Sequence, residues 1–536
     1  MPVTSPRSAA GDMLFGMGSK LLYATTRVAL PPLALAHMGL DDYGLWSTCF
    51  VLVSYVGMTA SGFSLVYLRR AAELLQQGNL AGLGALLSTG MLSMIMLTGF
   101  LLALLWNSLP WLLEVFRVAP AQQELAQDLW LGAVAIFLAD MSLGAFANVL
   151  HAMGRIRTEQ TVWIIAFLVE AVLIFTFLRL GWGAYGLLAA FGGRYLFSST
   201  TNAFLAWRAL PGLRLHWRAF DRTLLRRFFV FGASMQASGL LATGLQSFDR
   251  LLAGTLVGPH ATALTDLATK LPGTAGSITS SVSSIALSAA ARHDVAGQSQ
   301  AVREVYEEAL RLTVAGLMWT MPLLLAFSNT WTLSWLGPSG PHAQVGVLMA
   351  LSVIGLHAHL LTGPATSVAK GKGLLAPEFA YHGLRALALA LGVAVWWGLY
   401  EHSELPGFIA ALSIAQTIAA LGFIAHTHRQ LGGSWARLIS QFFLPTALGY
   451  LAAATLAWGL ATQGPLQALA CLTMQGAACE SISSAQTRGD ALIHLVIAAL
   501  LWLPLGAMVL WVSLLNRTEK ARFLISLGKM MQWKRS

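Results

Sequence analysis

Four ionisable side chains lie in two long apolar segments near the middle of the chain, where a charge is costly to bury. The segments are Phe228–Val257 and Ala261–Ala290, and each exceeds the roughly 20 helical residues that cross a bilayer. The four side chains are those of Asp249, Arg250, Asp266 and Lys270. A charge at the bilayer centre costs roughly 2.5–3.5 kcal/mol. These residues therefore favour a polar interior that pairs charges or binds a charged ligand.

Uncharged polar residues extend this pattern along both segments at steps of three and four. In the first segment they are Gln236, Gly239, Thr243 and Gln246, and in the second they are Gly273, Ser277, Ser280, Ser284 and Ser288. This spacing puts each set on one face of a helix. Small and hydroxyl residues also promote close helix packing in membranes, which is the alternative explanation. The ionisable residues favour a water-filled cavity over packing alone.

Further charged residues are predicted at membrane depth elsewhere in the chain. The cations are Arg27, Arg194, Arg311 and Arg385, and the acids are Asp140 and Glu170. Two readings of the acids remain open, as ion-pair partners of Arg194 or as proton-coupling groups. His357 and His359 are two residues apart and do not share a helix face, so we expect no metal site.

The composition indicates a polytopic membrane protein. Of 536 residues, 56% are hydrophobic and only 10% are charged, whereas soluble domains carry about 25% charged residues. The basic residues lie in short loops between apolar segments, so the net charge of +10 does not indicate a nucleic-acid partner. The sequence has no P-loop, HExxH or CxxC motif and no DxD pair. We therefore expect no cofactor and no enzymatic activity.

About fourteen apolar segments predict an all-α fold, with two pseudo-symmetric six-helix lobes and two further C-terminal helices. The expected parts are a cytoplasmic N-terminus (1–12), an N-lobe (13–206), an Arg-rich cytoplasmic linker (207–227), a C-lobe (228–427), two C-terminal spans (428–515) with an outer loop (463–490), and a basic tail (516–536). Most Lys and Arg residues fall in alternate loops, and only Arg117, Arg179 and Arg488 fall in the others. This asymmetry predicts that both termini are cytoplasmic.

An internal repeat at an offset of 219 residues supports the two lobes. Gly39, Gly78, Gly154 and Glu159 have Gly258, Gly297, Gly373 and Glu378 as counterparts. Both halves are predicted to start on the same side of the membrane, so the repeats are parallel. In the outer loop, Cys471 and Cys479 lie eight residues apart on the predicted oxidising side, and we expect a disulfide between them.

Several runs resemble a known family. The run Gly39-Leu-Asp-Asp-Tyr-Gly-Leu-Trp46, followed by Leu68-Arg-Arg-Ala71 and Gly78-Asn79, resembles the first hairpin of bacterial polysaccharide transporters. These are the Wzx-type flippases of the multidrug/oligosaccharidyl-lipid/polysaccharide exporter superfamily. Phe248-Asp249-Arg250 looks like that family's acidic–basic pair, and Leu361-Thr-Gly-Pro364 to Gly373 resembles its tenth span.

The resemblance implies a central cavity lined by the first, second, seventh and eighth spans. It also implies a cargo, an undecaprenyl-pyrophosphate-linked oligosaccharide moved across the bacterial inner membrane. Arg27, Arg250 and Lys270 lie where family members place cations for the pyrophosphate, and Arg and Lys make charge-assisted bonds to phosphate. The candidate ligands are Arg27, Arg250, Lys270, Arg194 and Arg385, with Asp249, Asp266, Asp140 and Glu170 as coupling or charge partners. The implied partners are the lipid-linked oligosaccharide, membrane lipids and the polysaccharide polymerase machinery.

Two other functions compete with this one. An ion-coupled multidrug or cation antiporter of the same superfamily is expected to have a net acidic cavity, whereas the predicted membrane-depth residues include more cations than acids. A membrane glycosyltransferase or ligase is expected to carry catalytic residues on a water-facing loop. The outer loop 463–490 offers only Glu480, Arg488 and Asp490 for that purpose. Neighbouring genes for glycosyltransferases and a polymerase would favour the flippase.

Overall fold

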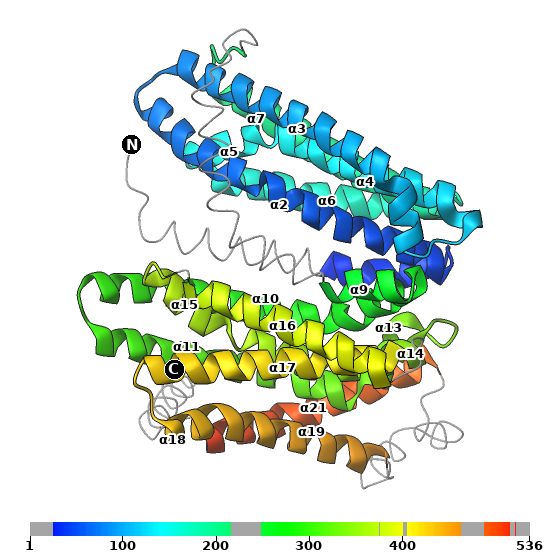
Figure 1. Ribbon diagram of the computed structural model, residues 1–536, viewed down its shortest axis with the longest axis vertical. Coiled ribbons are helices and arrows are strands. Elements are labelled where there is room, and N and C mark those ends of the chain that lie inside the picture. The colour runs from blue at the N-terminus through cyan, green and yellow to red at the C-terminus, as the bar shows by residue number, and fades with distance from the viewer. Residues whose placement is uncertain are drawn as a thin grey trace, which may run out of the picture. The chain divides into compact units, whose positions relative to one another are not determined.

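The structure is a computed structural model that describes residues 25–215, 248–374, 376–399, 405–461, 487–514 and 520. Within these ranges every regular element is a helix (Figure 1), which confirms the all-α class. Helices suit a bilayer because they satisfy their own backbone hydrogen bonds. The chain divides into two compact units, Met1–Asp266 and Leu267–Ser536. The expected linker 207–227 lies mostly outside the described residues, as do the outer loop up to residue 486 and its two cysteines.

The first unit contains the helices of the predicted N-lobe. They are residues 25–35, α2 (Leu40–Gln76), α3 (Leu80–Val115), the 3-10 turn η1 (Pro120–Gln122), α4 (Gln123–Leu143), α5 (Ala145–Ala152), α6 (Ile156–Arg179), α7 (Gly183–Ala209), α9 (Phe248–Leu256) and the start of α10 (Pro259–Val295). Tyr67 of α2, Leu86 of α3 and Phe146 of α5 belong to one buried cluster. This apolar cluster holds the helices of the unit together.

The second unit contains the rest of α10 and the helices that follow. They are α11 (Ser299–Met318), α12 (Met321–Ala326), α13 (Ser328–Leu336), α14 (His342–Leu360), α15 (Gly363–Gly371), α16 (Ala376–Leu399), α17 (Leu405–Gln430), α18 (Trp435–Leu438), the π-helical turn η2 (Ile439–Phe443), α19 (Leu444–Ala461) and α21 (Arg488–Ser513). Phe327, Ala453 and Trp502 share a buried cluster. Through it, the C-terminal helices α19 and α21 pack on α12.

The repeat at 219 residues is confirmed by the helix boundaries. Helices α2 and α10 are both 37 residues long, and their first residues, Leu40 and Pro259, are 219 positions apart. The glycines that follow them, Gly78 and Gly297, have φ angles of 67° and 69°. Residues other than glycine rarely adopt this left-handed conformation, so each glycine allows the chain to leave the helix. The same local rules therefore act at matching positions of both repeats.

A break inside a span is also repeated. Helix α4 ends at Leu143 and α5 resumes at Ala145, after Gly144. The counterpart of Gly144 is Gly363, the first residue of α15, where the sequence predicted a kink at Gly363–Pro364. Proline cannot donate a backbone hydrogen bond to the preceding turn, which explains the break at Pro364. In the first repeat a glycine alone accompanies the break.

Nine described helical segments are long and apolar enough to cross a membrane. They are Leu80–Val115, Pro120–Ala152, Ile156–Arg179, Ser299–Ala326, His342–Gly371, Ala376–Gly398, Leu405–Gln430, Trp435–Leu460 and Arg488–Ser513. Helices α2, α7 and α10 are 37, 27 and 37 residues long but less apolar than this set. The predicted total of about fourteen is therefore not reached among the described residues. The reason is that polar residues on these three helices lower their hydropathy.

Candidate functional site

Two arginines and one glutamate meet inside the first unit. The Nη2 atom of Arg27 lies 3.2 Å from Oε2 and 3.4 Å from Oε1 of Glu170. The Nε atom of Arg194 lies 3.3 Å from the same Oε2 atom. The side chains of Arg27, Glu170 and Arg194 are 15%, 5% and 8% exposed. This Arg27–Glu170–Arg194 cluster keeps an excess positive charge, because one carboxylate serves two guanidinium groups.

Aromatic rings hold the two guanidinium groups in place. The Cζ atoms of Arg27 and Arg194 lie 5.6 Å and 4.8 Å from the centre of the Phe167 ring. The Cζ atom of Arg194 also lies 5.1 Å from the Phe191 ring and 3.9 Å from the Tyr195 ring. Phe167 precedes Glu170 by three residues, so α6 presents both on one face. Cation–π contacts of this kind orient a guanidinium group while its N–H groups stay available for an anion.

Asp140 takes a hydroxyl partner in the structure. Asp140 of α4 accepts a hydrogen bond from the hydroxyl of Ser199 on α7. Ser199 lies five residues after Arg194 on the same helix. Of the two predicted acids, Glu170 is the one in ion-pair contact with Arg194. Asp140 is therefore anchored to the same helix through a neutral group.

A second charged cluster lies where α2, α9 and α10 meet. The Nη1 atom of Arg250 donates to Oδ1 of Asp266 at 3.0 Å, and the hydroxyl of Tyr43 donates to Oδ2 at 2.9 Å. Tyr43 is 2% exposed and Asp266 is 4% exposed. Asp249 accepts a hydrogen bond from the backbone N–H of Arg250, in the first turn of α9. The Tyr43–Asp266–Arg250 cluster thus keeps a buried carboxylate next to a cation.

The structure places the remaining candidates on two other helical positions. Lys270 is half-buried on α10, one turn after Asp266. Arg385 is 5% exposed on α16, one turn after His382, whose Nε2 atom lies 3.6 Å from Glu378. The structure thus brings Arg27 together with Arg194, and Arg250 together with Asp266. Lys270 and Arg385 belong to the second unit and are described within it.

Sequence reasoning missed the neutral residues that complete both clusters. Tyr43 belongs to the run that carries the family resemblance, but a tyrosine near a helix start gives no sign of a partner 223 residues away. Ser199 had a weak signal, because it extends the polar positions of α7 beyond Arg194. Phe167 is an apolar residue in an apolar span and gave no signal. None of these residues is ionised, so a search for buried charges passes over them.

Both clusters offer guanidinium donors, which suit binding of an anion. Guanidinium groups present planar sets of N–H donors that match phosphate oxygens. Among the described residues, no group of three or more His, Cys, Asp or Glu side chains is arranged to hold a metal ion. The geometry therefore supports recognition of an anionic ligand by charge.

A family comparison adds a finding that is independent of this geometry. Residues 38–338 match the model of a family described as "Polysaccharide biosynthesis protein". The match covers more than half of the chain. Comparison with curated protein sequences gave no match.

Several solved structures are similar in fold. The lipid II flippase MurJ in an inward closed conformation has a TM-score of 0.66 and 13% identity, over 93% of this chain and 98% of that one. An inward-facing multidrug resistance MATE family transporter of the MOP superfamily has a TM-score of 0.57 and 14% identity, over 78% and 94%. A MOP superfamily transporter from Pyrococcus furiosus has a TM-score of 0.51 and 16% identity, over 78% and 94%. At such identities the likeness concerns the fold alone.

Proposed function

Since this chain belongs to the polysaccharide biosynthesis protein family, we propose that it is a flippase for a lipid-linked oligosaccharide. The proposed cargo is an undecaprenyl-pyrophosphate-linked repeat unit of O-antigen or exopolysaccharide. The proposed site of action is the bacterial inner membrane, with both termini in the cytoplasm and the polysaccharide polymerase machinery as a downstream partner. The fold of the MOP superfamily supports alternating access as the mechanism.

One observation carries this proposal beyond family membership, namely the excess cation in the Arg27–Glu170–Arg194 cluster. A buried guanidinium group without its own carboxylate is costly in an apolar bundle. An anionic ligand offsets that cost while it is bound. The pyrophosphate group of the proposed cargo supplies such an anion, whereas a cationic drug would be repelled by the excess charge.

The two arginines have separable roles in this scheme. Arg194 is the more deeply buried of the two, and it stacks on Tyr195 and Phe191. It holds Glu170 in place. Arg27 is more exposed, at 15%, and it comes from a separate helix. Arg27 is therefore the proposed phosphate ligand, and Arg194 positions the carboxylate beside it.

The proposal is tested by transport in proteoliposomes. The protein is reconstituted with a fluorescent undecaprenyl-pyrophosphate oligosaccharide, and the fraction that reaches the outer leaflet is measured with a membrane-impermeant quencher. Arg27→Gln is expected to lower the transport rate by about tenfold or more, because a charge-assisted bond contributes roughly 1.5–3 kcal/mol. Glu170 keeps its contact with Arg194 in this variant, so the protein is expected to fold.

Arg179→Gln is the matched control. Arg179 is the last residue of α6, and its Cζ atom lies 5.1 Å from the Phe175 ring, away from Glu170. Transport by this variant is expected to equal that of the original protein. The proposal is wrong if Arg27→Gln transports the cargo at the normal rate. It is also wrong if the original protein moves cationic dyes but not the lipid-linked oligosaccharide, which would favour the antiporter.

A further inference from the structure

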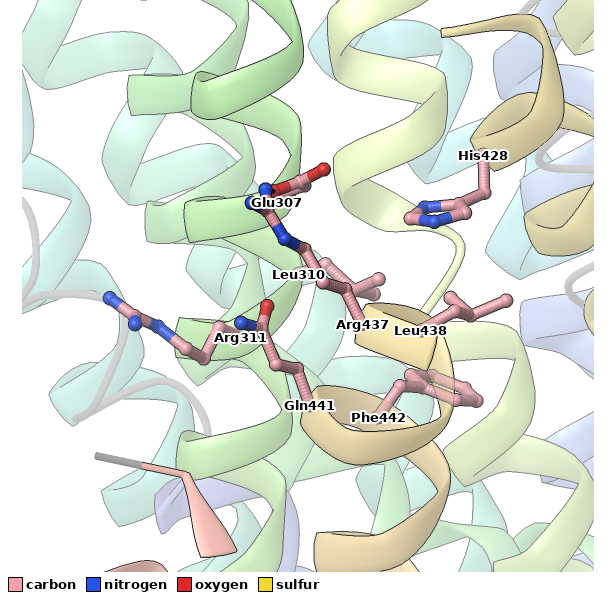
Figure 2. Close-up of a pocket in the computed structure, with 8 residues that line it drawn as sticks. All are labelled: Glu307, Leu310, Arg311, His428, Arg437, Leu438, Gln441 and Phe442. Carbon is pink, nitrogen blue, oxygen red and sulfur yellow. Dashed lines mark hydrogen bonds and ion pairs between the residues drawn. The ribbon is translucent and has the colours of Figure 1, made fainter. Parts of the chain in front are cut away.

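A small polar pocket lies in the second unit, away from both charged clusters of the first (Figure 2). It has a volume of about 230 Å³ and is lined by Glu307, Arg311, His428, Arg437 and Gln441, with three apolar side chains. The residues come from α11, from the end of α17, and from α18 with η2. The volume is below the roughly 300–1,000 Å³ of sites for drug-sized ligands. It therefore suits a small group such as a phosphate.

The charge around this α11–α18 pocket is mainly positive. Glu307 pairs with two arginines: its Oε1 atom lies 3.4 Å from Nε of Arg303, and its Oε2 atom lies 3.2 Å from Nη1 of Arg437. Arg311 follows Glu307 by one helical turn and adds a third guanidinium group. One carboxylate thus faces three arginines. Figure 2 shows Arg437 reaching from α18 toward Glu307, with Gln441 between α18 and Arg311.

A buried histidine in the pocket has an unused nitrogen. His428 is 2% exposed, and its Nε2 atom lies 3.0 Å from the carbonyl oxygen of Ser434. A carbonyl only accepts, so Nε2 carries a proton. The Nδ1 atom has no hydrogen-bond partner among the described residues. The rings of Tyr306 and Trp435 lie 6.0 Å and 6.4 Å from the histidine ring. These neighbours hold in place a group that still requires a polar partner.

The pocket opens beside an apolar surface that faces away from the unit. Leu312, Trp435, Ile439 and Phe443 are 50%, 53%, 56% and 40% exposed. The last three recur at steps of four along α18 and η2, next to Arg437 and Gln441. In a membrane protein, exposed apolar residues of a span contact acyl chains. A polar, basic pocket bordered by such a surface has the two chemical features of a phospholipid.

We propose that the α11–α18 pocket binds the phosphate head group of an anionic phospholipid. The arginines contact the phosphate oxygens, and the imidazole of His428 bonds to a polar atom of the head group through Nδ1. The acyl chains lie along Trp435, Ile439 and Phe443. Basic pockets between helices at the cytoplasmic face bind lipids of this kind in other membrane proteins. The loop 428–437 is predicted to be cytoplasmic, where such lipids are available. The bound lipid joins α18 to the end of α11, independently of the cargo.

The experiment measures lipid binding to the purified full-length protein by native mass spectrometry. Phosphatidylglycerol is expected to bind more tightly than phosphatidylcholine. Arg311→Gln is expected to weaken phosphatidylglycerol binding about fivefold, because one basic residue at an anionic surface contributes about that factor. This variant leaves both ion pairs of Glu307 intact. Gln441→Leu, which changes no charge, is a second variant that is expected to weaken binding in the same direction.

Arg429→Gln is the control, because Arg429 is exposed at the end of α17 and does not line the pocket. It is expected to bind phosphatidylglycerol as the original protein does. The proposal is overturned if Arg311→Gln and Gln441→Leu both bind phosphatidylglycerol with unchanged affinity. Equal binding of phosphatidylcholine also overturns it. If inorganic phosphate at the same concentration displaces phosphatidylglycerol, the pocket binds a free anion and the lipid assignment is wrong.

Discussion

Asp266 shows at the residue scale how a buried charge is retained. It receives one bond from Arg250 and one from Tyr43, both at about 3 Å. Removing one partner of a buried ion pair costs roughly 3–5 kcal/mol, whereas replacing both with neutral residues is often tolerated. Arg250→Gln is therefore expected to lower the melting temperature in detergent, and Arg250→Gln with Asp266→Asn is expected to restore it. Differential scanning fluorimetry measures both effects.

Transport separates structure from cargo binding in the same pair. If Arg250 is a phosphate ligand, the double variant folds but does not move the lipid-linked oligosaccharide. Recovery of transport together with stability would show that Arg250 only neutralises Asp266. Tyr43→Phe is the control, because it removes one hydrogen bond, worth about 1 kcal/mol, without changing a charge. The sequence had suggested Lys270 for this test, and the contact with Arg250 gives a better-defined pair.

At the scale of the elements, close contact between α14 and α17 depends on Gly355. Its backbone N–H donates to the hydroxyl of Ser413 at 2.9 Å. A Cβ atom added at Gly355 would lie 2.8 Å from Cα and 2.9 Å from the carbonyl oxygen of Ser413. Gly355→Ala is therefore expected to destabilise the protein by about 1–3 kcal/mol, since overpacking forces the helices apart. Thermal melting in detergent measures this.

Gly383 of α16 provides the matched substitution. A Cβ atom at Gly383 would meet nothing within 4 Å. Gly383→Ala is expected to leave the melting temperature unchanged or raise it, since alanine favours a helix more than glycine does. If both variants melt at the same temperature, contact with Ser413 does not limit the packing of α14 on α17.

The whole molecule has the fold of the MOP superfamily, which confirms the resemblance seen in the sequence. Its two repeats keep an offset of 219 residues from α2 and α10 to the turns at Gly154 and Gly373, whose φ angles are 75° and 70°. If the repeats are parallel, equivalent turns face the same side of the membrane. Reporter fusions after Gly154 and Gly373 are therefore expected to read cytoplasmic, and fusions near Ser339 to read periplasmic.

Opposite readings at Gly154 and Gly373 would contradict parallel repeats. A fusion near Arg117 provides an internal check, because the loop after α3 is predicted to be periplasmic. Agreement at all four positions would also support cytoplasmic placement of the basic loop 428–437, on which the lipid site depends. The predicted disulfide between Cys471 and Cys479 stays a prediction, and it requires the opposite, oxidising side.

The sequence by itself determined the helical class, the repeat and the positions of the buried charges. These follow from local rules. A left-handed turn requires a residue such as Gly78 or Gly297, and polar residues at steps of three and four occupy one helix face whatever packs against it. The same rules located Arg27, Glu170 and Asp266 inside apolar segments. Hydropathy did not fix the number of spans, because helices such as α2 and α10 carry polar residues along their length.

Only the tertiary structure decided which charges meet. Arg27 and Glu170 are 143 residues apart, and Tyr43 and Asp266 are 223 residues apart. Periodicity places a side chain on a face of its own helix, but it does not state which helix packs against that face. That choice depends on the close approach of distant segments, as at Gly355 and Ser413, and on side-chain shape. For this reason the sequence named the ionised residues of the site, and the folded chain supplied their neutral partners.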